Sequence, residues 1–239
     1  MALPSETPNL ARILRHRGPH LGALAIVHTV LFNAGLYPVT SFGAIHFPGP
    51  WESGEVIMSY FQTHPSPVLI CAFLQFGATV VLGIFTASIV SRLQFLGVRA
   101  AGPYIALFGG FATVFNGMAA SSLLWVMIHP GIAQDPTLLR ALYYLSYAFG
   151  GPGYSIPMGL LLAGVCVPAA FLKLLPKWVV GFGLALAVCG ELSWLNIIMP
   201  KALFLIPLVR FPGFVWLIAT GFMLPRTVAR PFRTAEVAA

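Results

Sequence analysis

Two opposite charges lie inside neighbouring apolar segments of the sequence, at nearly equal distances from the turn that joins these segments. Glu191 lies nine residues before Pro200, and Arg210 lies ten residues after it. At a rise of about 1.5 Å per helical residue, both side chains would lie about 14 Å below one face of a membrane. Because a lone charge at that depth costs about 3 kcal/mol on insertion scales, the spacing predicts an intramembrane ion pair between Glu191 and Arg210.

The chemistry expected of this pair is binding rather than proton transfer. A nearby guanidinium stabilises the ionised form of a carboxylate, so a paired Glu191 is a poor proton carrier. Arg210 could instead exchange Glu191 for a carboxylate or phosphate of a ligand and bind it through two parallel hydrogen bonds. An ion pair that only fixes the register of two helices is the structural alternative. No catalytic residue is predicted.

Further polar side chains lie at similar depths when they are counted from the outer ends of their segments. Depths of about 15–20 Å are expected for Asn33, Gln75 and Asn116. Amides inside membrane helices often serve only as interhelical hydrogen bonds worth about 0.6 kcal/mol each, which is the alternative for each of them. The predicted ligand-binding residues are Glu191, Arg210, Asn33, Gln75, Asn116, Tyr147 and Trp194.

The elements that must position these residues are membrane-spanning helices. Hydrophobic residues make up 58% of the 239 residues and charged residues only 8%, with a mean hydropathy of +0.88, whereas soluble domains carry roughly a quarter charged residues. The sequence therefore predicts an all-α, polytopic membrane protein that forms a single transmembrane domain over residues 1–239. The six expected spans run approximately over 20–45, 66–91, 101–128, 138–172, 177–199 and 202–225.

Basic residues predict the orientation of these spans, because positively charged loops stay on the cytoplasmic side. Ten basic residues fall on the side of the membrane that carries both termini. The other side receives Glu52, Glu55 and Asp135 with only Arg140 and Lys201. Both termini are therefore expected in the cytoplasm. The net charge of +7 is spread over short segments beside the membrane, so anionic lipid headgroups are expected partners and nucleic acid is not. The basic residues of the terminal side are Arg12, Arg15, Arg17, Arg92, Arg99, Lys173, Lys177, Arg226, Arg230 and Arg233.

Two local patterns add detail to the bundle. The fourth span is overlong and contains the glycine- and proline-rich stretch 150–153, which predicts either a simple kink or a short outer helix, a break and a longer inner helix. The exposed segment 46–65 is expected to cap an outward-facing polar pocket and to form a short amphipathic helix within 51–63.

Small residues predict which helix faces pack closely, because they let backbones approach inside a membrane. The third span carries such a stripe at Gly102, Ala106 and Gly110. The fifth span has Gly183 and Ala187 at the same spacing before Glu191, which places the carboxylate on the packing face. In the sixth span, Arg210 shares a face with two glycines, so both charges should point into the bundle.

The sequence predicts neither a metal site nor a haem site. His46, His64 and His129 lie on the outer side near three acids, but their spacing contains no metal-binding motif. A haem held by His28 would need a second intramembrane histidine at a compatible depth, and the sequence offers none. The three cysteines fall inside spans, with spacings unlike a metal or redox motif. The sequence thus identifies no metal and no cofactor.

The last two spans carry a resemblance to a family. The stretch 204–221, with its closing aliphatic-Trp-Leu-x-x-x-Gly pattern and the preceding Gly190-Glu191, resembles the last two helices of an uncharacterised family of bacterial six-helix inner-membrane proteins. The similarity covers about a third of the chain. It implies six helices in a bacterial inner membrane and implies no activity.

These observations favour a non-enzymatic function. We expect binding, with transport or sensing as variants, of a small or amphiphilic ligand that enters a polar pocket from the outer side. One alternative is an accessory subunit of a larger membrane complex that contacts partner subunits, lipids or pigments, and a homo-oligomer also stays open. The other is an intramembrane enzyme acting on a lipid or isoprenoid.

Overall fold

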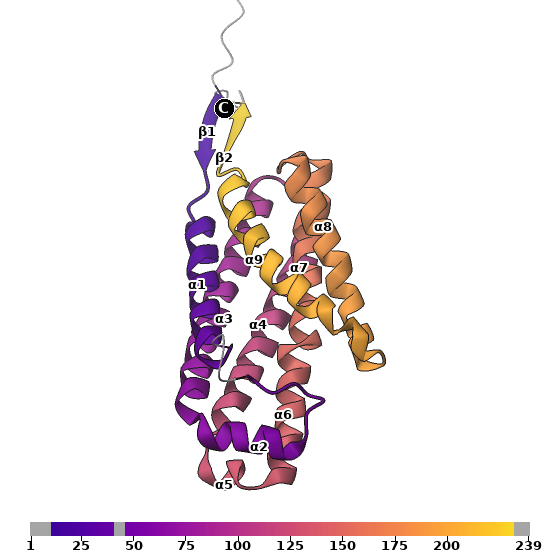
Figure 1. Cartoon of the computed structure of the whole chain (residues 1–239). Coiled ribbons are helices and arrows are strands. Elements are labelled where there is room, and N and C mark those ends of the chain that lie inside the picture. The colour runs from indigo at the N-terminus through magenta and orange to yellow at the C-terminus, as the bar shows by residue number, and fades with distance from the viewer. Residues whose placement is uncertain (1–10, 41–45, 232–239) are drawn as a thin grey trace, which may run out of the picture.

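Six helical segments are long and apolar enough to cross a membrane, and they pack into one bundle (Figure 1). The computed structural model describes residues 11–40 and 46–231. The six apolar helical segments confirm an all-α protein of the multi-pass membrane type. The crossing segments are α1 (Leu21–Thr40), α3 (Pro65–Phe95), α4 (Gly102–Met127), α6 with α7 (Pro136–Gly150 and Pro152–Phe171), α8 with the 3-10 helix η1 (Lys177–Leu192 and Ser193–Ile197), and the 3-10 helix η2 with α9 (Pro200–Phe204 and Leu205–Met223).

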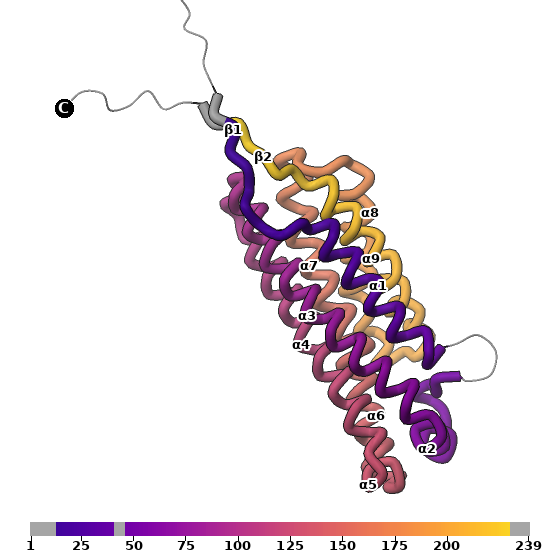
Figure 2. Tube along the Cα trace, turned by 90° about the vertical axis from the view of Figure 1, so that its left-hand side faces the viewer, coloured from indigo at the N-terminus to yellow at the C-terminus, as the bar shows by residue number. Residues whose placement is uncertain are grey.

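The two ends of the described chain meet at one end of the bundle, which we call the terminal end. Strand β1 (Ala11–Arg15) pairs with β2 (Thr227–Pro231) in antiparallel register, with Ile13 opposite Ala229. Both views place this strand pair beyond the ends of α1 and α9 (Figure 2). The first and last described residues therefore lie on the same side of the bundle, as six crossings between them require. Their cytoplasmic location stays a prediction.

The opposite end, which we call the far end, carries two short helices. These are α2 (Gly54–Thr63) and α5 (Pro130–Ala133). Helix α2 confirms the predicted amphipathic helix: Ser53 caps its first turn by accepting from the amide of Val56 at 3.3 Å, and it buries Ile57 and Phe61. With Leu139 of α6, these side chains belong to a second apolar core, separate from the core of the main bundle.

Helix α7 lies within the main core, where small residues let two neighbours, α4 and α8, approach its backbone. A Cβ added to Gly164 of α7 would lie 2.6 Å from the carbonyl oxygen of Gly102 and 2.5 Å from the amide nitrogen of Ala106 in α4. These two members of the predicted stripe therefore pack against α7. The third member, Gly110, faces Thr86 of α3 instead.

The last hairpin, formed by α8 and α9, ends short of α2 and α5 in both views. From its tip, α9 runs toward α1, which it contacts closely where Gly221 meets Gly22. Helix α8 packs along α7. The two helices of the hairpin thus contact different partners, and this difference decides where their charged side chains point.

Candidate functional site

The predicted break in the fourth span is present at Gly151, and it leaves backbone carbonyls that the helix itself does not satisfy. Gly151 has φ −89° and ψ −102°, outside the helical region, and Pro152 follows it. The amide of Tyr154 bonds to the carbonyl of Gly151 at 3.2 Å, which leaves the carbonyl of Gly150 without its helical donor. The carbonyl of Gly153 also lacks one, because the residue four positions on, Pro157, has no N–H.

Side chains from two other helices donate to these carbonyls. The guanidinium of Arg210 in α9 donates to the Gly150 oxygen. The amide of Asn116 in α4 donates to the Gly153 oxygen at 2.6 Å. Irregular backbone is tolerated inside a membrane protein where such partners satisfy it. A cation at the carboxyl end of α6 is also favoured by the dipole of that helix.

Aromatic rings enclose the guanidinium of Arg210. Its central carbon lies 4.8 Å from the ring centre of Tyr154 and 5.5 Å from that of Phe32 in α1. Phe32 in turn packs against Phe214, with ring centres 5.1 Å apart. Cation–π contacts of this kind stabilise a desolvated cation by about 2 kcal/mol. The Nε atom of Arg210 is nevertheless buried with no hydrogen-bond partner in the described chain.

Glu191 lies in the last turn of α8 and faces α7 rather than α9. A Cβ added to Gly159 of α7 would lie 3.0 Å from its Oε1 atom. The neighbouring Gly190 brings α8 equally close to the backbone carbonyl of Ser155. The small-residue stripe therefore predicted the packing face of Glu191 correctly. Its Oε1 atom is buried and has no hydrogen-bond partner in the described residues.

The predicted ion pair between Glu191 and Arg210 is wrong. Within residues 11–40 and 46–231, the one contact between an acidic and a basic side chain within 4.0 Å joins His46 to Glu52, at 3.5 Å. Equal depth places two residues at the same level of a bundle, but the direction of each side chain depends on the helix it packs against. Glu191 points at α7, whereas Arg210 points at the break and at the ring of Phe32.

Two other predicted ligand-binding residues face away from the bundle. Asn33 is exposed on α1, and its amide donates to the carbonyl of Thr29 in the same helix at 2.8 Å. Trp194 in η1 is 48% exposed. Neither can line an interior pocket in this arrangement. Their faces could not be read from depth alone, because depth carries no information on rotation about the helix axis.

The remaining predicted residues lie inside or at the edge of the bundle. Asn116 bonds to the carbonyl of Gly153, as described above. The hydroxyl of Tyr147 donates to the side chain of Asn196 in η1 at 3.3 Å. Gln75 is partly buried on α3, and its side chain lies against Gly35 of α1. Asn116 and Tyr147 thus both lie beside the break, and Gln75 lies at the α1–α3 contact.

The sequence did not single out the residues that surround Arg210 most closely, Phe32 and Tyr154. Both are ordinary aromatic residues in apolar spans. The hydroxyls of Tyr154 and Ser155 are buried without hydrogen-bond partners among the described residues. We define the break site as Arg210, Tyr154, Ser155 and Glu191, four side chains gathered along the first turns of α7 and each with an unpartnered buried polar atom.

Replacing Asn116 by alanine is expected to lower the free energy of unfolding by about 1 kcal/mol, because the Gly153 carbonyl would lose its donor. The matched control is Asn33→Ala, which removes an exposed amide and should change stability by less than about 0.5 kcal/mol. Unfolding in mixed micelles with increasing SDS measures both. Equal effects of the two substitutions would contradict the bridging role of Asn116.

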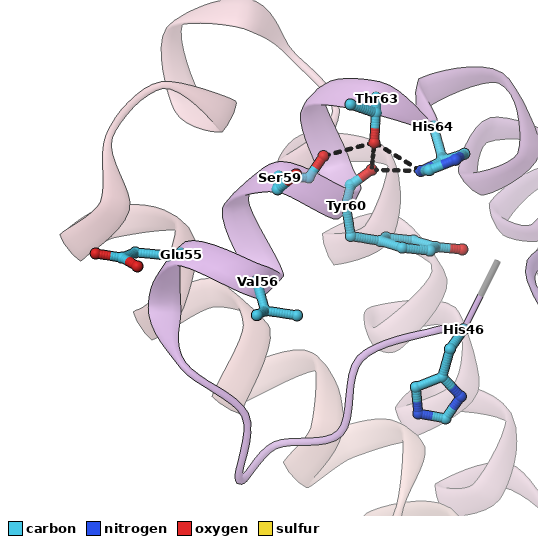
Figure 3. Close-up of a pocket in the computed structure, with 7 residues that line it drawn as sticks. All are labelled: His46, Glu55, Val56, Ser59, Tyr60, Thr63 and His64. Atoms are coloured by element: carbon cyan, nitrogen blue, oxygen red, sulfur yellow. Dashed lines mark hydrogen bonds between the residues drawn. The ribbon is translucent and has the colours of Figure 1, made fainter.

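A separate depression of about 390 Å³ lies at the far end, beside α2 (Figure 3). Thr63 donates to the carbonyl of Ser59 at 2.6 Å and lies 2.7 Å from Nδ1 of His64 (Figure 3). Burial raises the pKa of Tyr60 to about 12, with a smaller contribution from Cys71. In the described part of the chain, no three His, Cys, Asp or Glu side chains come together as metal ligands.

No protein-family model matches the chain, and neither the curated proteins nor the solved structures contain a significant match to it.

Proposed function

We propose that the protein binds a small or amphiphilic ligand inside the membrane, with its anionic group held by Arg210 at the break site. In this proposal the chain resides in a bacterial inner membrane with both termini in the cytoplasm. The break site then lies in the outer half of the bilayer, because Arg210 lies about 20 Å along α9 from the end of this helix that is nearest the terminal end of the bundle. The ligand enters from the outer side.

The observation that carries the proposal is the group of unpartnered polar atoms at the break site. More than about nine in ten buried polar groups in folded proteins have a hydrogen-bond partner. Here Arg210 Nε, the hydroxyls of Tyr154 and Ser155, and Glu191 Oε1 all lack one in the described chain. These atoms suit a ligand that carries an anionic group for Arg210 and a hydroxyl or amine for Glu191.

The absence of the predicted ion pair favours the same function. A guanidinium paired with Glu191 would have to release it before it could bind a ligand. Arg210 instead holds a neutral carbonyl, so its charge is not neutralised by any described carboxylate. The rings of Phe32 and Phe214 beside it offer apolar contact for the hydrocarbon part of an amphiphile.

The test measures binding of two probes, oleate as a carboxylate amphiphile and lysophosphatidic acid as a phosphate amphiphile. Native mass spectrometry of the full chain in detergent counts bound probe, and thermal unfolding reports stabilisation. Arg210→Lys keeps the charge but loses the planar guanidinium, so affinity for at least one probe should fall about tenfold or more. Arg140→Met is the matched control, since Arg140 makes a similar aromatic contact with Tyr144, at 5.6 Å, on the exposed side of α6.

The outcomes separate the proposal from its alternatives. If neither probe binds, and Arg210→Met lowers stability by the same amount with and without probe, Arg210 serves only to cap α6. Stoichiometric copurification with other membrane proteins, without bound probe, would indicate an accessory subunit. Turnover of a lipid substrate that Glu191→Gln abolishes in a folded protein would indicate an enzyme.

A further inference from the structure

Three basic side chains meet at the terminal end of the bundle, about 20 Å or more along the helices from the break site. They come from three separate parts of the chain: His16 follows β1, Arg92 lies in the last turns of α3, and Arg226 precedes β2. The amide of His16 bonds to the carbonyl of Arg226 at 2.9 Å, which holds the two residues together. The imidazole of His16 lies 3.1 Å from the hydroxyl of Ser91, next to Arg92. We call these three residues the basic site.

Arg92 is the central residue of the basic site, and it is completely buried, with an exposed fraction of 0%. One of its nitrogens donates to the carbonyl of Pro19 at 3.3 Å. Its Nε and Nη1 atoms are buried and have no partner in the described chain. Arginine stays protonated in proteins, so this charge persists wherever the side chain is placed. A buried charge without a counter-ion is strongly destabilising.

The neighbours of Arg92 do not neutralise this charge: Arg226 adds a second positive charge, and His16 carries no negative charge. The Nε of Arg226 and the Nδ1 of His16 are also buried without partners among the described residues. Burial lowers the pKa of His16, and the positive charges of Arg92 and Arg226 lower it further. The four carboxylates of the described chain lie elsewhere: Glu52, Glu55 and Asp135 at the far end and Glu191 at the break site. The basic site thus lacks a described protein counter-ion.

We propose that the basic site binds a phosphate group. A phosphate presents several acceptor oxygens, and guanidinium groups bind it through paired, charge-assisted hydrogen bonds. The unpartnered donors of Arg92, Arg226 and His16 supply such bonds from three separate parts of the chain. The phosphate comes either from the headgroup of an anionic phospholipid or from a soluble phosphate. A basic pocket between helices at the membrane surface suits the first source, and the test separates the two.

The test uses the full chain in three environments: phosphatidylcholine nanodiscs, the same nanodiscs containing phosphatidylglycerol, and phosphatidylcholine nanodiscs with inorganic phosphate in the buffer. Thermal unfolding midpoints report stabilisation, and native mass spectrometry counts the phosphatidylglycerol molecules retained after release. We expect phosphatidylglycerol to raise the midpoint of the unsubstituted protein and at least one molecule to be retained.

Substitutions assign this effect to the basic site. Arg92→Met keeps most of the side-chain volume and removes the charge, so affinity for phosphatidylglycerol should fall about tenfold or more. Arg226→Gln and His16→Gln should weaken it in the same direction, and they carry the comparison if Arg92→Met does not fold. Arg99→Met is the matched control, because Arg99 is an exposed basic residue in the loop after α3 and its loss should change affinity less than about twofold.

Each outcome decides the proposal. Stabilisation by inorganic phosphate but not by phosphatidylglycerol, with the same sensitivity to Arg92→Met, supports the site and assigns it to soluble phosphate. The proposal is overturned if neither probe stabilises the protein, or if Arg99→Met loses as much affinity as Arg92→Met. It is also overturned if Glu6→Gln with Glu236→Gln, two carboxylates outside the described residues, destabilises the protein in phosphatidylcholine as much as Arg92→Met does.

Discussion

Trp216→Ala is expected to lower the free energy of unfolding by about 3 kcal/mol or more. Trp216 is a fully buried residue of α9, and its indole fills a notch that Gly183 leaves in α8 beside Cys166 of α7. Its N–H also donates to the carbonyl of Val179 at 3.1 Å. Truncation to alanine would leave a cavity between three helices and would remove this interhelical hydrogen bond.

Two further substitutions are compared with Trp216→Ala. Trp216→Phe keeps a large ring and loses only the hydrogen bond and part of the volume, so it should cost about 1 kcal/mol. Trp194→Ala removes an equally large side chain that is 48% exposed, and it should cost less than about 0.5 kcal/mol. SDS-induced unfolding in mixed micelles measures all three. If Trp194→Ala proved as harmful as Trp216→Ala, the packing of α9 against α8 would differ from the one described.

Gly164→Val is expected to be comparably harmful, for a steric reason. Gly164 brings α7 into backbone contact with α4, where an added Cβ would lie 2.5 Å from the amide nitrogen of Ala106. No side-chain rotation can relieve a clash with backbone, so the helices would have to separate along their length. The destabilisation should reach about 3 kcal/mol, near the upper end for overpacked sites.

The control for this prediction is Gly181→Val in α8. A Cβ added to Gly181 meets no atom within 4 Å, so valine there should change stability by less than about 0.5 kcal/mol. The fraction of protein that elutes as a monodisperse species in detergent, together with the unfolding free energy, measures both substitutions. A well-folded Gly164→Val variant of normal stability would contradict the close α4–α7 contact.

The sequence predicted those features of the fold that depend on apolar length and on backbone chemistry. Six apolar stretches led to six crossing helices, and the residues 150–153 led to the break between α6 and α7. The stripe before Glu191 predicted its packing face, because small residues are needed wherever two membrane helices meet closely. Each of these signals is local in the sequence.

The candidate site could be predicted only in part, because its geometry depends on contacts between distant segments. Arg210 was expected to face Glu191, but the carbonyl that it binds is 60 residues away, at Gly150. That acceptor exists only because the break removes a helical donor from it. Phe32 and Tyr154 have no sequence pattern that distinguishes them from other aromatic residues of the spans. The basic site likewise joins residues near both ends of the chain with the end of α3.

The length of α3 has a consequence for how the molecule meets its surroundings. Its 31 residues form a rod about 46 Å long, whereas the hydrocarbon layer of a bilayer is about 30 Å thick. Even at a tilt of about 40°, the helix would span roughly 35 Å along the membrane normal. It is therefore longer than the hydrocarbon layer is thick at every tilt that is usual for membrane helices. Part of α3 must therefore lie beyond the hydrocarbon layer, and each helical turn that protrudes at its Pro65 end carries the adjoining helix α2 about 5 Å further from the lipid.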